Sequence, residues 1–271
     1  MKKLLALLMT ACLLFAFAGC GGKTTSSDSS ATKSDSETVK EKGKLVIGIT
    51  DYAPLDYEET KGSGKWIGFD ADMARAFAKT LGVEAEFVVI DWDNKIMELD
   101  SKSIDCVWNG MTIGDEVKNG MSVTNAYLKN TQVVVVPKDK ADKYQTLESV
   151  KDLNFAAEAG SAGETALKAL NYKVTSVTAQ TDALMEVRSK TSEAAVIDLI
   201  MAGAVIGEGT SYEDLTYTVG VAEEENFGVG FRKGSDLTEK LNEFFKTSYA
   251  DGSMMKLAKQ YGVQESILEQ K

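Results

Sequence analysis

Histidine is absent from the 271 residues of this chain. Its absence excludes Ser-His-Asp and Cys-His nucleophilic catalysis, the usual acid–base side chain at pH 7, and any metal site built on imidazole. Cysteine is scarce, and the positions of Cys12, Cys20 and Cys106 suit neither a zinc cluster nor a disulfide framework. We therefore expect a protein that has no metal, no cofactor and no enzymatic activity.

Basic side chains are fewer than acidic ones. Lysine and arginine together number 30 against 41 acidic side chains, which gives a formal net charge of −11. Binding to nucleic acid requires clustered basic side chains, so we expect no nucleic-acid partner. The length allows one large domain or two small ones with a substantial core. The composition favours an acidic globular protein with little catalytic equipment, and we expect a monomer.

The first twenty residues have the pattern of a secretory signal. Lys2 and Lys3 precede a short apolar run, and small residues at positions 18 and 19 stand directly before Cys20. This segment resembles the lipobox of bacterial lipoproteins, which implies that residues 1–19 are removed and that Cys20 is lipidated. The expected location is extracytoplasmic, on the outer face of the cytoplasmic membrane, with the lipid as the only membrane attachment. An uncleaved anchor with an incidental cysteine is the alternative.

The next segment, residues 20–42, is almost entirely polar and is predicted to be a flexible tether. Strands and helices then alternate. Asp70 is expected to cap the first of these helices, and Ser161 with Glu164 forms a capping-box pattern. The alternation indicates parallel α/β units, whose ligand sites lie at the carboxyl ends of the strands. Strands are predicted at residues 44–49, 87–90, 104–108, 132–136, 154–158, 194–197, 215–219 and 227–231, and helices at residues 70–81, 92–99, 160–170, 236–249 and 253–261.

A series of segments extends over most of the chain after the tether, at residues 68–72, 92–99, 104–105, 110–113, 159–161, 195–198 and 227–234. In the order and spacing of these segments, the chain from Gly43 to about Val263 resembles the family 3 solute-binding proteins, which are the receptors of polar amino-acid ABC transporters. The resemblance implies the two-lobed α/β fold of type II periplasmic binding proteins, a ligand trapped between the lobes, and an ABC permease as partner. It places lobe 1 at residues 43–137 and 222–271 and lobe 2 at residues 138–221, with crossovers near residues 135–138 and 219–228.

The same resemblance implies how an amino-acid zwitterion would be held. Asp198 would accept hydrogen bonds from the ammonium group, and Thr112 and the helix start at Ser161 would hold the carboxylate. Tyr52 and Trp92 would enclose the body of the ligand. The full set of expected contacts is Asp51, Tyr52, Trp92, Gly110, Met111, Thr112, Lys118, Glu158, Ser161, Ala162 and Asp198.

One position departs from the family pattern. The family usually has an arginine five residues after the binding threonine, where it clamps the ligand carboxylate, but this chain has Val117 there. Lys118 is the candidate substitute for that arginine. Glu158 and Asp51 add negative charge near Asp198. We therefore predict an importer receptor for amino acids, with a cationic amino acid as a possible ligand and an amine without a carboxylate as the alternative.

Each candidate also has a purely structural explanation. Trp92 could be a core residue, Asp198 could cap a helix, and Glu158 could face solvent. Cys106 lies on an apolar strand and is expected to be a buried thiol, and the acidic run at residues 223–225 is expected to be a solvated turn. Two other functions remain open: a ligand-sensing module without transport, and an enzyme like the periplasmic cyclohexadienyl dehydratases, for which Glu158 is the candidate acid or base.

Overall fold

The structure is a computed structural model that describes residues 33–271. The predicted signal at residues 1–19, the lipidation at Cys20 and most of the predicted tether therefore lie outside the described residues. Between residues 33 and 271, the helices are all too short or too polar to cross a membrane. The same residues hold no cluster of three or more acidic or cysteine side chains that could bind a metal ion.

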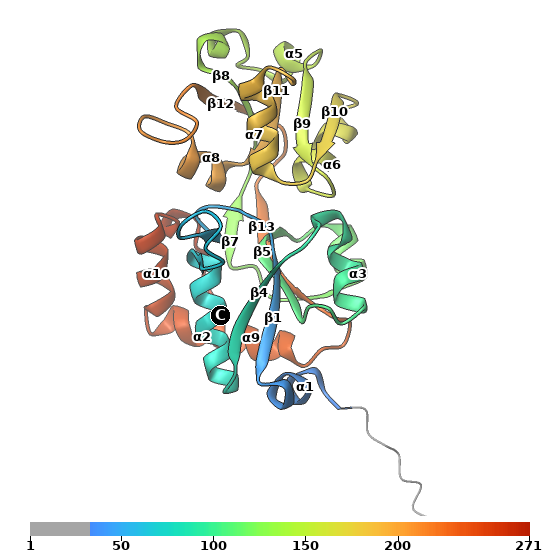
Figure 1. Cartoon of the computed structure of the whole chain (residues 1–271), viewed down its shortest axis with the longest axis vertical. Coiled ribbons are helices and arrows are strands. Elements are labelled where there is room, and N and C mark those ends of the chain that lie inside the picture. The colour runs from blue at the N-terminus through green and yellow to red at the C-terminus, as the bar shows by residue number, and fades with distance from the viewer. Residues whose placement is uncertain (1–32) are drawn as a thin grey trace, which may run out of the picture. The chain divides into compact units, whose positions relative to one another are not determined.

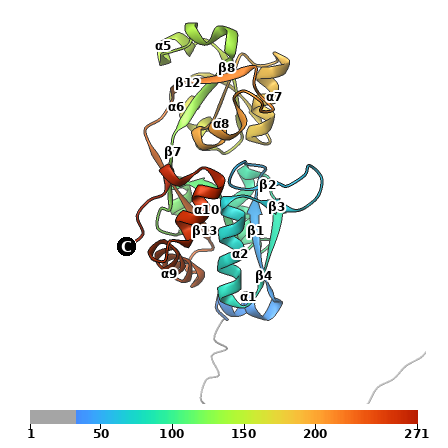
Figure 2. The same ribbon diagram turned by 90° about the vertical axis from the view of Figure 1, so that its left-hand side faces the viewer.

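Lobe 1 is built on a six-stranded sheet with the strand order β4-β1-β5-β13-β6, in which β7 also pairs with β13 (Figures 1 and 2). Strand β1 runs parallel to β4 and β5, and the returning β13 is antiparallel to β5. The elements of this lobe are α1 (Asp35–Lys42), β1 (Lys44–Ile49), β2 (Tyr57–Glu58), β3 (Trp66–Ile67), α2 (Phe69–Leu81), β4 (Glu84–Val89), η1 (Trp92–Asn94), α3 (Lys95–Asp100), β5 (Cys106–Thr112), α4 (Asp115–Gly120), β6 (Ser122–Val123), β7 (Leu128–Asn130), β13 (Glu225–Phe231), α9 (Leu237–Ala250), α10 (Ser253–Tyr261) and η3 (Gln264–Ser266).

Lobe 2 is built on a five-stranded sheet with the order β10-β9-β11-β8-β12. Its central strands are apolar on both faces, as expected for a sheet that is covered by helices on both sides. The elements are β8 (Gln132–Pro137), η2 (Lys138–Lys143), α5 (Leu147–Val150), β9 (Asn154–Glu158), α6 (Ala162–Ala169), β10 (Lys173–Val177), α7 (Gln180–Ser189), β11 (Ala194–Asp198), α8 (Leu199–Val205) and β12 (Leu215–Gly220).

The chain crosses between the lobes twice. Strand β7 ends at Asn130 in the sheet of lobe 1, and β8 begins at Gln132 in the sheet of lobe 2, so the first crossover is at Thr131. The boundary predicted at residue 137 was wrong, because β8 is a buried inner strand between β11 and β12 rather than the last strand of lobe 1. The second crossover, between Gly220 and Glu225, lies within the predicted range.

The end of the predicted tether is folded. Residues 35–42 form α1, which begins with a capping box at Ser34 and buries Val39 completely. The Ser36 amide donates to the Asp236 carboxylate at 3.0 Å. The tether prediction failed here because a short, polar helix with one buried apolar side chain has almost no hydrophobic signal in the sequence; its position depends on polar contacts with distant residues.

Asp70 has a different role from the predicted one. Helix α2 begins one residue earlier, after Gly68, and no side chain caps it. The Asp70 carboxylate is completely buried and accepts hydrogen bonds from the Gly110 amide at 2.9 Å and from the Tyr127 hydroxyl at 2.7 Å. Asp70 therefore fixes the backbone of β5 at Gly110, where that strand approaches the space between the lobes. The thiol of Cys106, also on β5, is free and buried as predicted.

Candidate functional site

A cavity of about 440 Å³ lies between the lobes, where strands of both sheets end. The loop after β1 and the end of β5 form its wall in lobe 1, and the ends of β9 and β11 form its wall in lobe 2. This is the position at which open α/β sheets bind ligands. The cavity is lined by Tyr52, Trp92, Lys95, Asn109, Gly110, Met111, Thr112, Gly114, Asp115, Glu116, Val117, Gln132, Glu158, Gly160, Ser161, Ala162, Thr165, Ala166, Ala169, Gln180, Asp198 and Ala222.

The structure brings the predicted ligand contacts together with two exceptions. Asp51 is exposed and does not line the cavity, although its neighbour Tyr52 does. Lys118 is also exposed and outside the cavity wall, whereas Val117 before it is buried and lines the cavity. Consecutive residues of the short helix α4 point in different directions, so the helix presents Val117 to the cavity and turns Lys118 away. In this structure Lys118 therefore does not take the place of the missing arginine.

Asp198, at the end of β11, is held by three side-chain amides. Asn130 and Gln132 donate to its Oδ1, the latter at 2.7 Å, and Gln180 donates to Oδ2. Burial, followed by the nearby Glu225 carboxylate, raises the pKa of Asp198 well above its ordinary value. A carboxylate has about four acceptor positions, so one remains on Oδ2 for a donor in the cavity. A ligand cation there would stabilise the ionised form of Asp198.

Glu225 belongs to this network and corrects one prediction. Its side chain accepts hydrogen bonds from Asn130 at 2.6 Å and from Gln132 at 2.7 Å. The Glu225 side chain therefore belongs to the hydrogen-bond network around Asp198 and does not lie in a solvated turn. Residue 225 is the first residue of β13, directly after the second crossover. The same two amides thus connect Asp198 of lobe 2 with Glu225 of the returning strand.

Tyr52 and Gly110 form the floor of the cavity in lobe 1. Gly110 has a φ of +57°, and a Cβ atom built on it would lie 2.7 Å from Cε1 of the Tyr52 ring, so glycine is required for this close approach. Tyr52 is 2% exposed, and its hydroxyl has no hydrogen-bond partner. Burial, then Asp198 and Glu225, raise the pKa of this hydroxyl well above 10. The Tyr52 hydroxyl is therefore a neutral, unused donor.

Ser161 caps the helix that faces the cavity from lobe 2. Its hydroxyl accepts from the Glu164 amide at 3.0 Å, as the capping-box pattern predicts. The Glu164 carboxylate, however, accepts from the amide of Gly160 at 3.0 Å rather than from that of Ser161. The first amides of α6 have no acceptor within the helix, and Ala162 lines the cavity, so this helix start can receive an anionic group.

Glu158 faces the cavity rather than solvent. It is 2% exposed, and its Oε1 atom has no hydrogen-bond partner. Burial raises the pKa of the Glu158 carboxyl to about 8, although the Lys95 ammonium lowers it. A buried acid with a free oxygen is the kind of group that a ligand donor completes.

Lys95 is the basic residue of the cavity wall, and the sequence analysis missed it, as it missed Gln132 and Gln180, which hold Asp198. It is 2% exposed, and it donates to the carbonyl oxygens of Trp92 at 3.3 Å and of Gly160 at 3.1 Å. A lysine at a helix start is normally expected in solvent. The signal that could have identified it is its spacing: Trp92, Lys95 and Leu99 share one face of a helix, and the other two are buried.

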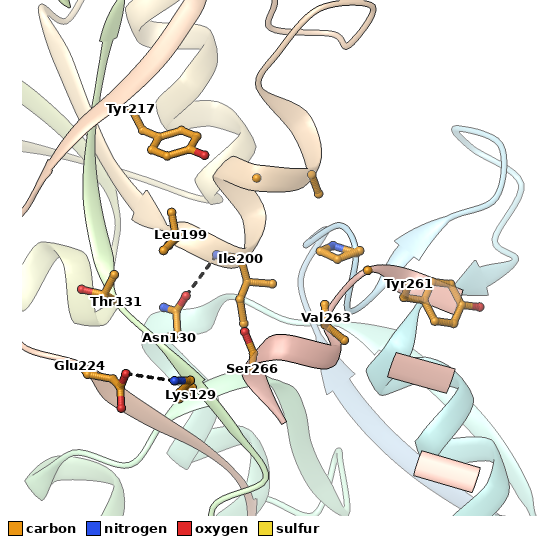
Figure 3. Close-up of a pocket in the computed structure, with 14 residues that line it drawn as sticks. Lys129, Asn130, Thr131, Leu199, Ile200, Tyr217, Glu224, Tyr261, Val263 and Ser266 are labelled. Carbon is orange, nitrogen blue, oxygen red and sulfur yellow. Dashed lines mark hydrogen bonds and ion pairs between the residues drawn. The ribbon is translucent and has the colours of Figure 1, made fainter. Parts of the chain in front are cut away.

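A second, larger cavity of about 770 Å³ lies beside the first crossover (Figure 3). There the Asn130 side chain accepts a hydrogen bond from the amide of Ile200 at 3.2 Å, and Lys129 forms an ion pair with Glu224 at 3.6 Å. None of the predicted ligand contacts lines this cavity, and neither does Lys95. The cavity between the strand ends, with its buried acids and its buried lysine, is therefore the candidate site.

Comparison with known proteins agrees with this geometry. Residues 45–264 match the family model of bacterial extracellular solute-binding proteins, family 3. The chain belongs to this family. Its solute-binding fold places the candidate cavity between two lobes, as the resemblance implied, and the predicted fold class is confirmed.

Relatives of this solute-binding protein bind amino acids. The arginine-binding extracellular protein ArtP of Bacillus subtilis is 31% identical over 266 residues, which cover 96% of this chain and 98% of the relative. An amino acid ABC transporter substrate-binding protein from Streptococcus pneumoniae, solved with bound L-arginine, has 27% identity and a TM-score of 0.75 over 88% of this chain and 100% of that one. The ancestral amino acid-binding protein AncCDT-1, a precursor of cyclohexadienyl dehydratase, has 30% identity and a TM-score of 0.76 over 84% of this chain and 99% of that one.

Proposed function

We propose that this protein is the extracytoplasmic receptor of an ABC importer and captures an amino acid, with a cationic amino acid as the favoured ligand. The observation that carries the proposal is the cavity between the strand ends, in which Asp198 keeps a free acceptor position and Glu158 keeps a free oxygen. The arginine-binding relatives support the cationic class. The ligand would select the closed arrangement, since only there do both lobes contact it.

Delivery would need further partners. The ABC permease is proposed from family membership, and the lipid at Cys20 is proposed from the sequence pattern before that residue. Attachment by lipid would keep the receptor next to the permease at the outer face of the cytoplasmic membrane. A test is metabolic labelling with a fatty-acid analogue: the wild-type chain should be labelled, and Cys20→Ala should not.

The ligand is tested by thermal unfolding of the purified, ligand-free protein with the common amino acids and their decarboxylated amines. A ligand at 100 times its Kd adds about 2.7 kcal/mol to the free energy of unfolding, which raises the midpoint by roughly 5–10 °C. We expect cationic amino acids to give this rise. Asp198→Asn should weaken their binding about 10–100-fold, because it removes the counter-charge of the ammonium group.

The control is Asp152→Asn, which changes an exposed acid in lobe 2 and should leave binding unchanged. If no amino acid raises the midpoint, or if Asp198→Asn binds as tightly as the wild type, the proposed function is wrong.

An enzyme is the second candidate, and one observation favours it. The Glu158 carboxyl has a pKa of about 8, so it could donate or accept a proton near neutral pH, and AncCDT-1 stands close to a dehydratase lineage. We propose binding rather than catalysis, because ArtP and the Streptococcus pneumoniae relative are amino-acid-binding proteins. An assay distinguishes the two functions: the protein is incubated with a carboxylated cyclohexadiene, and ultraviolet absorbance detects any aromatic product. Product formation that Glu158→Gln abolishes would favour the enzyme.

A further inference from the structure

Lys95 is a buried cation at the boundary between the lobes. It begins α3 in lobe 1, and it alone among the residues that line the candidate cavity carries a basic side chain. Its ammonium lies 5.4 Å from the centroid of the Trp92 ring, which borders the same cavity. A basic side chain inside the candidate site is therefore a property of this chain, although no arginine is present at position 117.

The Lys95 ammonium has no acidic partner. Its hydrogen bonds go to the carbonyl oxygens of Trp92 and Gly160, so one of its three N–H groups stays free. Across residues 33–271, no ion pair within 4.0 Å joins Lys95 to a carboxylate. Burial of a charge without a counter-charge is costly, so an anion that entered the cavity would be stabilised at this point.

The Glu158 carboxyl, which also lines the cavity, does not supply the missing charge. Glu158 is close enough for Lys95 to lower its pKa, but burial outweighs this effect and leaves the pKa of Glu158 at about 8. At pH 7 this carboxyl group is therefore mostly protonated in the ligand-free cavity. The positive charge of Lys95 is left uncompensated.

A second anion-binding element adjoins Lys95. Gly160, whose carbonyl accepts from the Lys95 ammonium at 3.1 Å, directly precedes Ser161, the N-cap of α6. The first amides of α6 therefore begin beside the ammonium group, and helix starts favour negative charge. A cation from lobe 1 and a helix start from lobe 2 thus meet at one point on the cavity wall.

We propose that Lys95 is the cationic partner of the ligand's carboxylate and binds it together with the amides at the start of α6. In this arrangement Lys95 supplies the charge that the family resemblance assigned to an arginine at position 117. The inference rests on the proposed function, because it requires an amino acid in this cavity. It also argues against an amine without a carboxylate as the natural ligand.

The test combines removal of the ammonium group with removal of the ligand carboxylate. Isothermal titration calorimetry of the whole protein is carried out with L-arginine and agmatine, L-lysine and cadaverine, and L-histidine and histamine. In the wild type, we expect at least one amino acid to bind about tenfold or more tightly than its amine. Lys95→Met should weaken that amino acid about 10–100-fold and change the affinity for the amine less than threefold, so that the preference disappears.

Two further variants make the result specific. Lys118→Met removes an exposed lysine outside the cavity and should leave both affinities unchanged. Lys95→Arg keeps the charge and should keep most of the preference for the amino acid. If Lys95→Met fails to fold, Lys95→Gln, which can still donate to the carbonyl of Gly160, is measured in the same way.

Three outcomes would overturn the inference, and they separate its failure from that of the proposed function. If Lys95→Met weakens an amino acid and its amine equally, Lys95 has only a structural role. If the wild type binds both members of each pair equally well, the cavity binds the amino acids without using their carboxylate, and only the role of Lys95 is lost. If the wild type binds none of the six compounds, the proposed ligand class fails and the role of Lys95 with it.

Discussion

Glu158 shows how burial sets the charge of a single side chain. Its carboxyl group is 2% exposed in the cavity wall, so ionisation of Glu158 is unfavourable without a ligand. Burial accordingly raises its pKa from 4.5 to about 8. A cationic group in the cavity would reverse this balance, because it would stabilise the ionised carboxylate.

The raised pKa of Glu158 predicts a dependence of stability on pH. Between pH 4.5 and about pH 8 the folded protein binds more protons at this group than the unfolded chain does, so the group's contribution to stability falls as the pH rises. Glu158→Gln removes this effect. We expect the variant to be more stable than the wild type at pH 9, by on the order of a few kcal/mol, and equally stable near pH 4.5.

Urea unfolding of the ligand-free proteins at pH 4.5, 7 and 9 measures this difference. Glu223→Gln, which changes an exposed glutamate, is the control and should follow the wild type at every pH. A difference between Glu158→Gln and the wild type that does not change with pH would contradict the assignment.

Sequence reasoning identified site residues that lie at predictable places in an α/β fold. Asp198 ends a strand and Ser161 begins a helix, and such positions face the ligand cleft in this class of fold. Sequence reasoning could not predict whether Lys95 and Lys118 face the cavity, because packing decides which side of a short helix does so. The orientation of each helix follows from one buried residue, which is Leu99 in the helix of Lys95 and Val117 in the helix of Lys118.

At the scale of elements, the strands with long apolar runs were predicted well and the short polar elements were not. Strands β1 and β9 have the predicted limits, as does α10. Helices α1 and α4 were missed, because each has little apolar surface and is fixed by contacts far away in the sequence. The ten-residue helix α7 was not predicted either, although Ala183, Leu184 and Val187 lie in the main core, so local sequence specified only part of the core.

Helix α1 is predicted to contribute to the stability of lobe 1. Val39 is its one completely buried apolar residue, and it packs into the main hydrophobic core. Val39→Ala should lower the free energy of unfolding by about 2 kcal/mol and the melting midpoint by roughly 4–8 °C. Lys40→Ala, which changes the adjacent exposed residue, should have little effect. Differential scanning calorimetry measures both; equal midpoints for the two variants would mean that α1 does not stay packed in solution.

At the scale of the molecule, the two lobes touch directly at Gly160. A Cβ atom built on Gly160 would lie 2.7 Å from Oδ1 and 2.8 Å from Cα of Asp93, which belongs to lobe 1. The Cα atom of Asp93 belongs to the backbone and cannot move aside as the end of a side chain can. The lobes can therefore approach this closely only if residue 160 is glycine.

Gly160→Ala is predicted to oppose closure of the lobes. Affinity for every ligand should fall about tenfold or more, and the radius of gyration at saturating ligand should stay larger than in the wild type. The matched control is Gly82→Ala, whose φ of +76° carries a similar backbone cost but whose Cβ atom would meet nothing within 4 Å. Calorimetric titration and small-angle X-ray scattering measure the two effects. Unchanged affinity in Gly160→Ala would show that this contact is absent from the ligand-bound state.

The attachment of α1 ties the beginning of the described chain to lobe 1. Arg232 pairs with Asp35 at 3.1 Å, and Lys42 pairs with Asp105 at 2.5 Å, so both ends of the helix are fastened to lobe 1. A force transmitted along the polypeptide before Lys33 therefore acts on lobe 1 alone. In the described part of the chain, lobe 2 is joined covalently to lobe 1 by two short crossovers. In a receptor held at a surface by its N-terminal segment, lobe 1 would be the stationary lobe, and each capture of a ligand would be a swing of lobe 2 toward it.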